Sequence, residues 1–300
     1  LLDGNVLINQ IPTAVTDFEG YVRVFQGFVK AAFRAGNHVV VVFDEPDYVT
    51  KAKAAEQKKR DASRKKGVAT CSVDIAESLA PRNDEYDAEV VARCNPHDLL
   101  ANRAARGRFY DELLVTVMKR QIPNLSDCQT LTFDGIDHRG AARPRGEDRM
   151  PDVFSSNEML EPLLTRRQPG VLPIGEGDLK LPELAGEVQR LRNEGVYFKD
   201  VEIILTSTID TDAIAIELLH QSAKNEAAAA SKEEGSETGR TIKSILCFRE
   251  RSGKRENGDT PKALYACFDL QMLHSALVSK LFGPLVDENV HLHKFAIALI

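Results

Sequence analysis

The stretch His38-Val39-Val40-Val41-Val42-Phe43-Asp44 decides the fold, because it is an unbroken apolar run that ends in an acid. Its β-branched residues favour a strand. Apolar and polar positions do not alternate in it, which is typical of a parallel strand covered by helices on both faces. We therefore expect a buried strand that carries Asp44 at its carboxyl end.

A helix is expected directly before this strand. Asp17 is a suitable N-terminal cap, and apolar residues then recur at steps of three and four residues until Gly36. The apolar positions are Phe18, Val22, Phe25, Val29 and Phe33. Still earlier, residues 1–8 are expected to form a short buried strand.

The alternation of strands and helices continues along the chain. Further strands are expected at residues 130–133, 201–205, 242–248 and 263–268, and further helices at 109–122, 181–191, 212–220 and 271–282. Two insertions are expected: a loop at 135–172 and a low-complexity segment at 221–240 that is helical or disordered. This order predicts an α/β fold, a three-layer α/β/α sandwich with a mostly parallel central sheet. We expect residues 1–300 to form a single domain, as a fragment of a longer chain.

Composition narrows the class of protein. Apolar residues make up 43% of the 300 positions and charged residues 28%, as in a globular protein. No apolar run is long enough to span a membrane, and no signal peptide is visible, so we expect no membrane partner. The five cysteines are scattered without a C-x-x-C pair. This favours a reducing intracellular compartment, the cytoplasm or nucleus, with the mitochondrion as a further option, and it does not support a zinc site.

The charge is unevenly distributed. The formal net charge is −6, which argues against simple electrostatic coating of nucleic acid. Residues 51–66 nevertheless contain eight basic residues and two acidic ones. Such a segment favours one positively charged channel, although a solvated helix face is the alternative interpretation.

Six acids lie within or after an expected strand, or just before an expected helix. They are Asp3, Asp44, Glu176, Asp178, Asp210 and Asp212. Ligands of α/β sheets collect at the carboxyl ends of the strands. Two carboxylates about 4 Å apart repel by ~4 kcal/mol at an effective dielectric of 20, so a converging group requires cations. Mg²⁺ and Mn²⁺ prefer such oxygen ligands, and two ions ~3.5–4 Å apart support in-line phosphodiester hydrolysis. The alternative is that each acid merely caps a helix or solvates a loop.

Four motifs carry these acids in a recognisable order. They are Leu2-Asp3-Gly4-Asn5, Val42-Phe43-Asp44-Glu45-Pro46, Gly175-Glu176-Gly177-Asp178-Leu179-Lys180 and Thr208-Ile209-Asp210-Thr211-Asp212. In this order the sequence resembles the XPG/FEN/Xrn superfamily of 5′ nucleases, which share a PIN-like fold. Asn5 and the third motif make the Xrn-type 5′→3′ exoribonucleases the closest branch.

The resemblance implies a role for each of these residues. The six acids would hold two Mg²⁺ or Mn²⁺ ions. Asn5 and Lys180 would contact the acids and hold them in position without binding the ions. Lys51, Lys58 and Lys59 would bind the terminal or scissile phosphate. The implied activity is metal-dependent 5′→3′ hydrolysis of single-stranded RNA, in which hydroxide attacks in line and no protein group acts as nucleophile.

The sequence also departs from the family pattern. Glu45 stands in place of a glycine, Asp178 in place of a glutamate, and the last metal-binding Asp of the family would follow Ile300. Two alternatives therefore stay open. One is a flap endonuclease that acts on branched DNA. The other is an inactive nuclease fold that serves as a scaffold or RNA-binding subunit of a larger assembly, with protein partners on its insertions. The oligomeric state and the sequence beyond either end are also left open.

Overall fold

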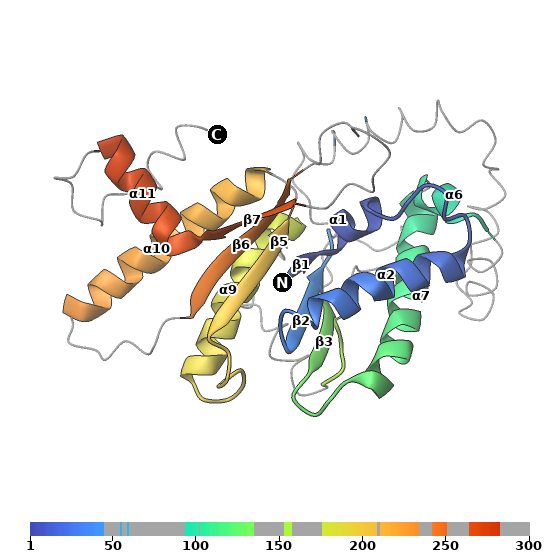
Figure 1. The fold of residues 1–300 in the computed structure, drawn as a ribbon, viewed down its shortest axis with the longest axis horizontal. Coiled ribbons are helices and arrows are strands. Elements are labelled where there is room, and N and C mark those ends of the chain that lie inside the picture. Colours follow the sequence, from blue (N-terminus) through green and yellow to red (C-terminus); the bar gives the residue numbers. More distant parts are fainter. Residues whose placement is uncertain are drawn as a thin grey trace, which may run out of the picture. The chain divides into compact units, whose positions relative to one another are not determined.

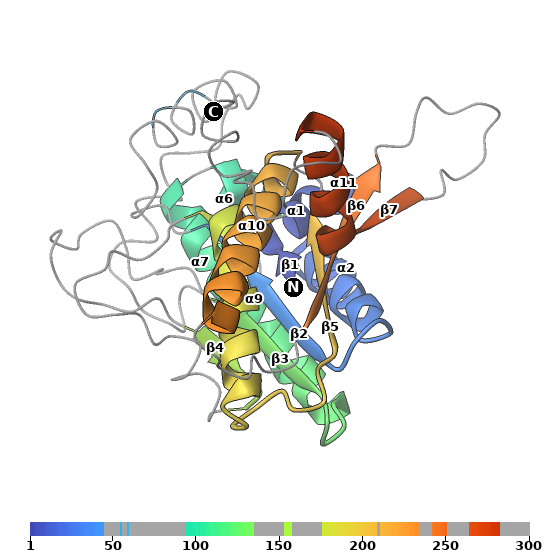
Figure 2. The ribbon, with the colours of Figure 1, turned by 90° about the vertical axis from the view of Figure 1, so that its left-hand side faces the viewer.

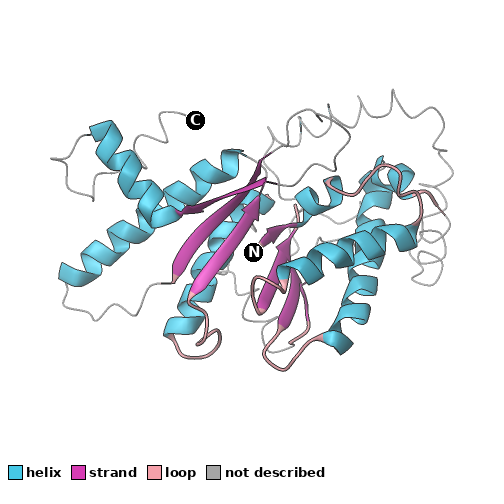
Figure 3. Cartoon of the chain, viewed as in Figure 1, coloured by secondary structure: helices cyan, strands magenta, loops and turns pink. Residues whose placement is uncertain are grey.

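The computed structural model describes residues 1–44, 55, 59, 94–101, 103–134, 153–157, 176–208, 211–233, 242–250 and 264–282. The chain divides into two compact units. Unit 1 consists of Leu1–Asp3 and Asp178–Ile300, and unit 2 of Gly4–Gly177. Each unit combines strands with helices (Figures 1 and 3) and is described by itself.

Unit 2 contains one parallel and one antiparallel strand pair in its described part. Its elements are helices α1 (Gly4–Asn9), α2 (Phe18–Ala32), α6 (Pro96–Ala101) and α7 (Arg103–Gln121), the 3-10 turn η1 (Ile122–Asn124), and strands β2 (His38–Val42), β3 (Thr130–Asp134) and β4 (Val153–Ser155). Strands β2 and β3 pair in parallel, with His38 opposite Thr130, and β4 runs antiparallel to β3. The expected buried strand before Asp44 and the expected strand at 130–133 are therefore confirmed.

The core of unit 2 is aromatic. Helix α2 begins at the expected cap, where the backbone N–H of Gly20 donates to Asp17 Oδ1 over 2.7 Å. The ring of Phe25 lies 6.4 Å from that of Phe43 and 6.2 Å from that of Phe133, centre to centre. All three side chains are fully buried. The apolar face of α2 thus covers β2 and β3, as its spacing predicts.

Two expectations about local structure are wrong. The strand expected at residues 1–8 ends at Asp3, because the chain turns into helix α1 at Gly4. A Cβ atom on Gly4 would lie 2.4 Å from the Phe43 ring, so glycine permits this close approach. The loop expected at 135–172 contains a strand, β4, whose residues pair with β3.

Unit 1 has its own set of strands and helices (Figure 2). The strands are β1 (Leu2–Asp3), β5 (Ile203–Thr208), β6 (Lys243–Glu250) and β7 (Leu264–Asp269), and the helices are α9 (Gly177–Asn193), α10 (Thr211–Glu233) and α11 (Leu270–Phe282). Within this unit the strand order is β1-β5-β6-β7. Pairs β1–β5 and β5–β6 are parallel, and β6–β7 is antiparallel.

Helix α10 extends well into the segment expected as a second insertion. It is continuous from Thr211 to Glu233, so the helical alternative is confirmed for residues 221–233. Gln221 and Ser222 are buried, which shows that this part of the segment belongs to the packed body of unit 1. Residues 234–240 lie outside the described part of the chain.

The fold class is confirmed at the level of α/β structure with mixed, mostly parallel strand pairing. Within the described ranges, no helix combines the length and the apolar character that crossing a bilayer requires. The expectation of a single domain stays a prediction, since the two units are described separately.

Candidate functional site

Asp44 connects two of the sequence motifs within unit 2. It follows β2 at the carboxyl end of the strand and is half-buried. Its Oδ1 accepts a hydrogen bond of 2.7 Å from the backbone N–H of Gly177, a residue 133 positions later. The second motif is therefore joined directly to the third.

The third motif lies at the start of helix α9. Glu176 precedes the helix, and Asp178 lies in its first turn. The first N–H groups of a helix have no partner within the helix and carry a partial positive charge, so an anion is stabilised there. Asp44 satisfies one of these groups, the N–H of Gly177, which directly follows Glu176 in the chain.

Lys180 is buried in unit 1, with 1% of its surface exposed. Lysine is almost never fully buried unless acceptors surround its ammonium group. This burial suits the expected role of Lys180 as a support for acids. Asn5, for which the resemblance implies a similar role, lies in helix α1 of unit 2 and is half-buried.

The first and fourth motifs meet in unit 1. Asp3 ends β1 and is 7% exposed, and Leu2 pairs with Ser207 near the end of the parallel strand β5. The carboxyl ends of β1 and β5 therefore lie at the same edge. Asp212 lies in the first turn of α10, where the structure describes the backbone and not the side chain, and Asp210 lies outside the described residues.

Two of the three predicted phosphate-binding lysines lie outside the described residues. Lys51 and Lys58 are not among the described residues. Lys59 is described as helical and exposed, a placement equally suited to phosphate binding and to a solvated helix face. The basic channel stays a prediction.

No group of three or more His, Cys, Asp or Glu side chains within the described ranges is arranged to hold a metal ion. Among the expected ligands, Asp210 lies outside those ranges, and Asp3 and Asp44 belong to different units. The donor chemistry itself suits a hard divalent cation, because carboxylate oxygens are the preferred ligands of Mg²⁺. A carboxylate also has two oxygens, so the bond to Gly177 is compatible with metal binding by Asp44.

Sequence reasoning missed a further acid at a strand end. Asp134 ends β3, is 7% exposed, and lies opposite Val42 in the neighbouring strand β2. Asp44 follows Val42 by two residues, so both acids belong to the same edge of the sheet in unit 2. The signal was present, because Thr132-Phe133-Asp134 repeats the pattern of a strand that ends in Phe-Asp, as at Phe43-Asp44.

A group of ionisable residues on helix α10, of which Glu217 is buried and the other two half-buried, was also missed. Glu217, His220 and Lys224 recur at steps of three and four residues and thus share one side of the helix. Burial raises the pKa of Glu217 to about 7, although the positive charge of Lys224 and a hydrogen bond with Thr206 act in the opposite direction. Burial lowers the pKa of His220 to about 4 and also lowers that of Lys224. The signal in the sequence was a charged side chain within the apolar stretch Ala213-Ile214-Ala215-Ile216-Glu217-Leu218-Leu219.

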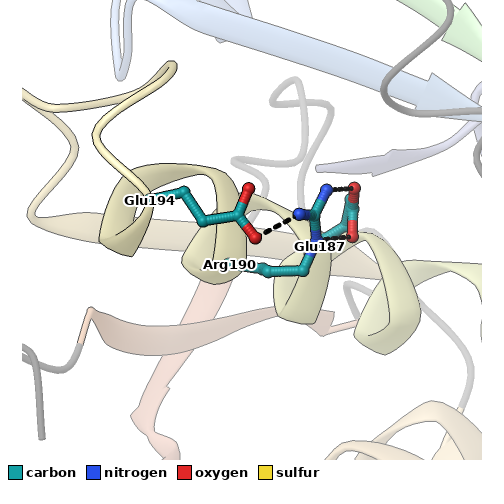
Figure 4. A network of polar contacts seen from close by, with 3 residues as sticks. All are labelled: Glu187, Arg190 and Glu194. Atoms are coloured by element: carbon teal, nitrogen blue, oxygen red, sulfur yellow. Dashed lines mark hydrogen bonds and ion pairs between the residues drawn. The ribbon is translucent and has the colours of Figure 1, made fainter.

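Helix α9 has ion pairs on its more exposed side (Figure 4). Arg190 lies between Glu187 and Glu194 and donates to both carboxylates, with 2.6 Å between Nη2 and Glu187 Oε1. These hydrogen bonds raise the pKa of Arg190 above its usual value. Pairs at these spacings stabilise a helix, so they support the element that carries the third motif.

No protein-family model, curated protein or solved structure matches this chain.

Proposed function

We propose that the chain is a divalent-metal-dependent 5′→3′ nuclease that hydrolyses single-stranded RNA. The observation that carries this proposal is the hydrogen bond between Asp44 Oδ1 and the N–H of Gly177, because it joins two separately predicted acid motifs. The parallel pairing of β1 with β5 supports it, since it brings the first and fourth motifs to one edge of unit 1.

The finer architecture belongs to the same proposal. A PIN-like three-layer sandwich would bring all the strand ends that carry acids to one edge of a single sheet. Each unit contains parallel strand pairs, and the mostly parallel pairing over the two units together is compatible with that arrangement.

The acids would bind two Mg²⁺ or Mn²⁺ ions. Bound ions would supply an activated water and neutralise charge on the phosphate as the bond breaks. Asp3, Asp44, Glu176, Asp178, Asp210 and Asp212 would hold the ions, and Lys180 would offset the repulsion among the carboxylates. Lys51, Lys58 and Lys59 would bind the 5′ or scissile phosphate and so position the RNA for in-line attack.

The test is an RNA degradation assay on the natural polypeptide that contains this chain. Single-stranded RNA with a 5′ phosphate, the same RNA with a 5′ hydroxyl, and a 5′-flap DNA are each incubated with Mn²⁺ or with EDTA. We expect Mn²⁺-dependent loss of the phosphorylated RNA. In the variants Asp44→Asn and Asp210→Ala/Asp212→Ala we expect a loss of at least about 100-fold, because each removes charge from the metal site.

The matched control is Asp127→Asn, which removes one acid from an exposed turn of unit 2. This variant should retain the wild-type rate. Wild-type rates in the Asp44 and Asp210/Asp212 variants would contradict the proposal. Cleavage at the flap junction in place of RNA loss would assign the chain to structure-specific DNA endonucleases.

A second candidate function is that of a nuclease fold without catalysis, which acts as a scaffold or RNA-binding subunit. The observation in its favour is that one of the two carboxylate oxygens of Asp44 already accepts a hydrogen bond from the backbone N–H of Gly177. This candidate predicts that Mn²⁺ leaves the melting temperature unchanged, whereas an ion-binding site gains stability when the ion binds. Inactivity on all three substrates together with an unchanged melting temperature would favour it over the nuclease.

A further inference from the structure

Two cysteines face each other across neighbouring strands of unit 1. Cys247 on β6 and Cys267 on β7 are direct partners in the antiparallel register. Their Sγ atoms are 3.4 Å apart. Cys267 is exposed, and Cys247 is half-buried. The pair lies outside all four acid motifs.

The backbone geometry suits a covalent bond between these sulfurs. Residues directly opposite each other in an antiparallel pair have Cα atoms about 4.5–5.5 Å apart, within the roughly 4.4–6.8 Å that a disulfide spans. Closing the gap from 3.4 Å to a bond of about 2.05 Å requires side-chain rotation and little backbone movement. We propose that Cys247 and Cys267 are a redox-active pair that forms a disulfide by exchange with a small-molecule disulfide such as oxidised glutathione.

The two thiols differ in their expected roles. Burial, and then the hydrogen bond with Cys267, raise the pKa of Cys247 to about 11, so Cys247 is almost fully protonated at neutral pH. The thiolate is the nucleophile in exchange, and access to the oxidant is required. Cys267 is therefore the attacking residue, with the S–H of Cys247 positioned to donate to its thiolate.

The exchange proceeds in two balanced steps. The Cys267 thiolate attacks one sulfur of oxidised glutathione, whose disulfide bond breaks, and one glutathione thiolate leaves and takes up a proton. Cys247 then loses its proton to solvent and attacks the sulfur of Cys267, which releases the second glutathione. Two cysteine thiols are oxidised to one disulfide, and one oxidised glutathione is reduced to two glutathione molecules.

The proposed disulfide would link strand β7 covalently to strand β6. In the described part of unit 1, β7 is bonded to β6 and ends the strand order. Lys243 on β6 already forms a 2.9 Å ion pair with Asp269 at the end of β7. A disulfide would add a covalent link across positions 20 residues apart in the chain, and such a link restricts the unfolded chain more than the folded one. Oxidation should therefore stabilise unit 1 whichever candidate function applies.

The test is mass spectrometry of the reduced chain after exposure to oxidised glutathione and alkylation of the remaining thiols. In the wild-type chain we expect a linked pair of peptides that contains Cys247 and Cys267. In Cys247→Ser we expect one stable glutathione on Cys267, and in Cys267→Ser no glutathione on Cys247. The wild-type melting temperature should rise by a few degrees on oxidation and return on reduction.

Closure of the wild-type bond should accelerate with pH, by up to about tenfold per pH unit between pH 7 and 9, as the Cys247 thiol ionises. The matched control is Cys128→Ser, which removes an exposed thiol of unit 2 and should leave the linked peptides unchanged. The proposal is overturned if Cys128 reacts while the Cys247–Cys267 pair stays reduced, or if the oxidised wild-type chain links either residue to a different cysteine. Circular dichroism of each serine variant verifies that it is folded.

Discussion

The interiors of the two units differ in chemical character. In unit 2, fully buried rings of Phe25, Phe43 and Phe133 pack against one another, and Asp134 is the one buried carboxyl or basic side chain in its described part. The described interior of unit 1 contains four, namely Asp3, Lys180, Glu217 and His274. Burial of an ionisable group is unfavourable unless partners compensate for the lost water. Packing should therefore dominate the stability of unit 2, whereas pH should influence that of unit 1.

The largest effect is expected from removal of an aromatic ring in unit 2. Phe25→Ala should lower the free energy of unfolding by about 3–5 kcal/mol, because the cavity it leaves is enclosed by Phe43 and Phe133. Denaturant unfolding followed by far-ultraviolet circular dichroism measures this change. Ile122→Ala is the control, because the Ile122 side chain is 44% exposed and its loss should matter little. A loss below about 1 kcal/mol for Phe25→Ala would show that this core is not tightly packed.

A smaller and pH-dependent effect is expected from Glu217 in unit 1. Its pKa of about 7 lies above the ordinary value of 4.5, so the folded chain binds a proton that the unfolded chain releases. This contribution to stability is complete below about pH 4.5 and is lost as pH rises through about 7. At roughly 1.4 kcal/mol per pKa unit, the loss amounts to about 3 kcal/mol. Glu217→Gln should remove this part of the pH dependence.

The measurement is the free energy of unfolding of both chains from pH 4 to pH 8. As pH rises, the free energy of unfolding of the wild type should fall relative to that of Glu217→Gln. Glu202→Gln is the control, because Glu202 is an exposed acid of the same unit and its replacement should leave the wild-type profile in place. Parallel profiles for wild type and Glu217→Gln would contradict the inferred pKa.

The sequence predicts the fold best where one local signal is sufficient. The cap at Asp17 and the helical spacing after it locate α2, and the run from Val39 to Val42 locates β2, because each needs no knowledge of distant residues. The end of β1 could not be predicted. A segment as short as residues 1–8, with apolar residues at both ends, suits a strand or a helix. The close approach of Gly4 to Phe43 accompanies the turn into α1.

In the candidate site, too, local patterns are predictable and contacts between distant residues are not. The end of an expected strand located Asp44, and the start of an expected helix located Asp178, each from a local pattern. Asp3, by contrast, is expected inside a strand over residues 1–8 and instead ends β1. The hydrogen bond from Gly177 to Asp44 could not be predicted, because it joins residues 133 positions apart through the tertiary fold. The burial of Glu217 is likewise set by what packs over α10, and the helical pattern alone does not distinguish a buried charge from an exposed one.

The smallest effects are expected at the surface, where the described part of each unit includes an arginine that binds carboxylates with more than one nitrogen. Arg120 on α7 donates from Nη1 and Nη2 to both oxygens of Glu19 on α2. Arg190 binds Glu187 and Glu194 within its own helix (Figure 4). Exposed ion pairs contribute between about 0 and 1 kcal/mol, so Arg120→Ala and Arg190→Ala should each destabilise by less than about 1 kcal/mol.

Arg120 should matter more than Arg190, because it fixes two helices to each other, whereas Arg190 strengthens a helix that packing already maintains. Lysine has a single side-chain nitrogen and cannot donate from two nitrogens to both oxygens of Glu19. Arg120→Lys should therefore be almost as destabilised as Arg120→Ala. Both effects should shrink in 1 M salt, where exposed charges are screened over about 3 Å. A loss above about 2 kcal/mol for Arg190→Ala that persists in high salt would mean that the stability of unit 1 depends on its surface charges as well as on its buried ones.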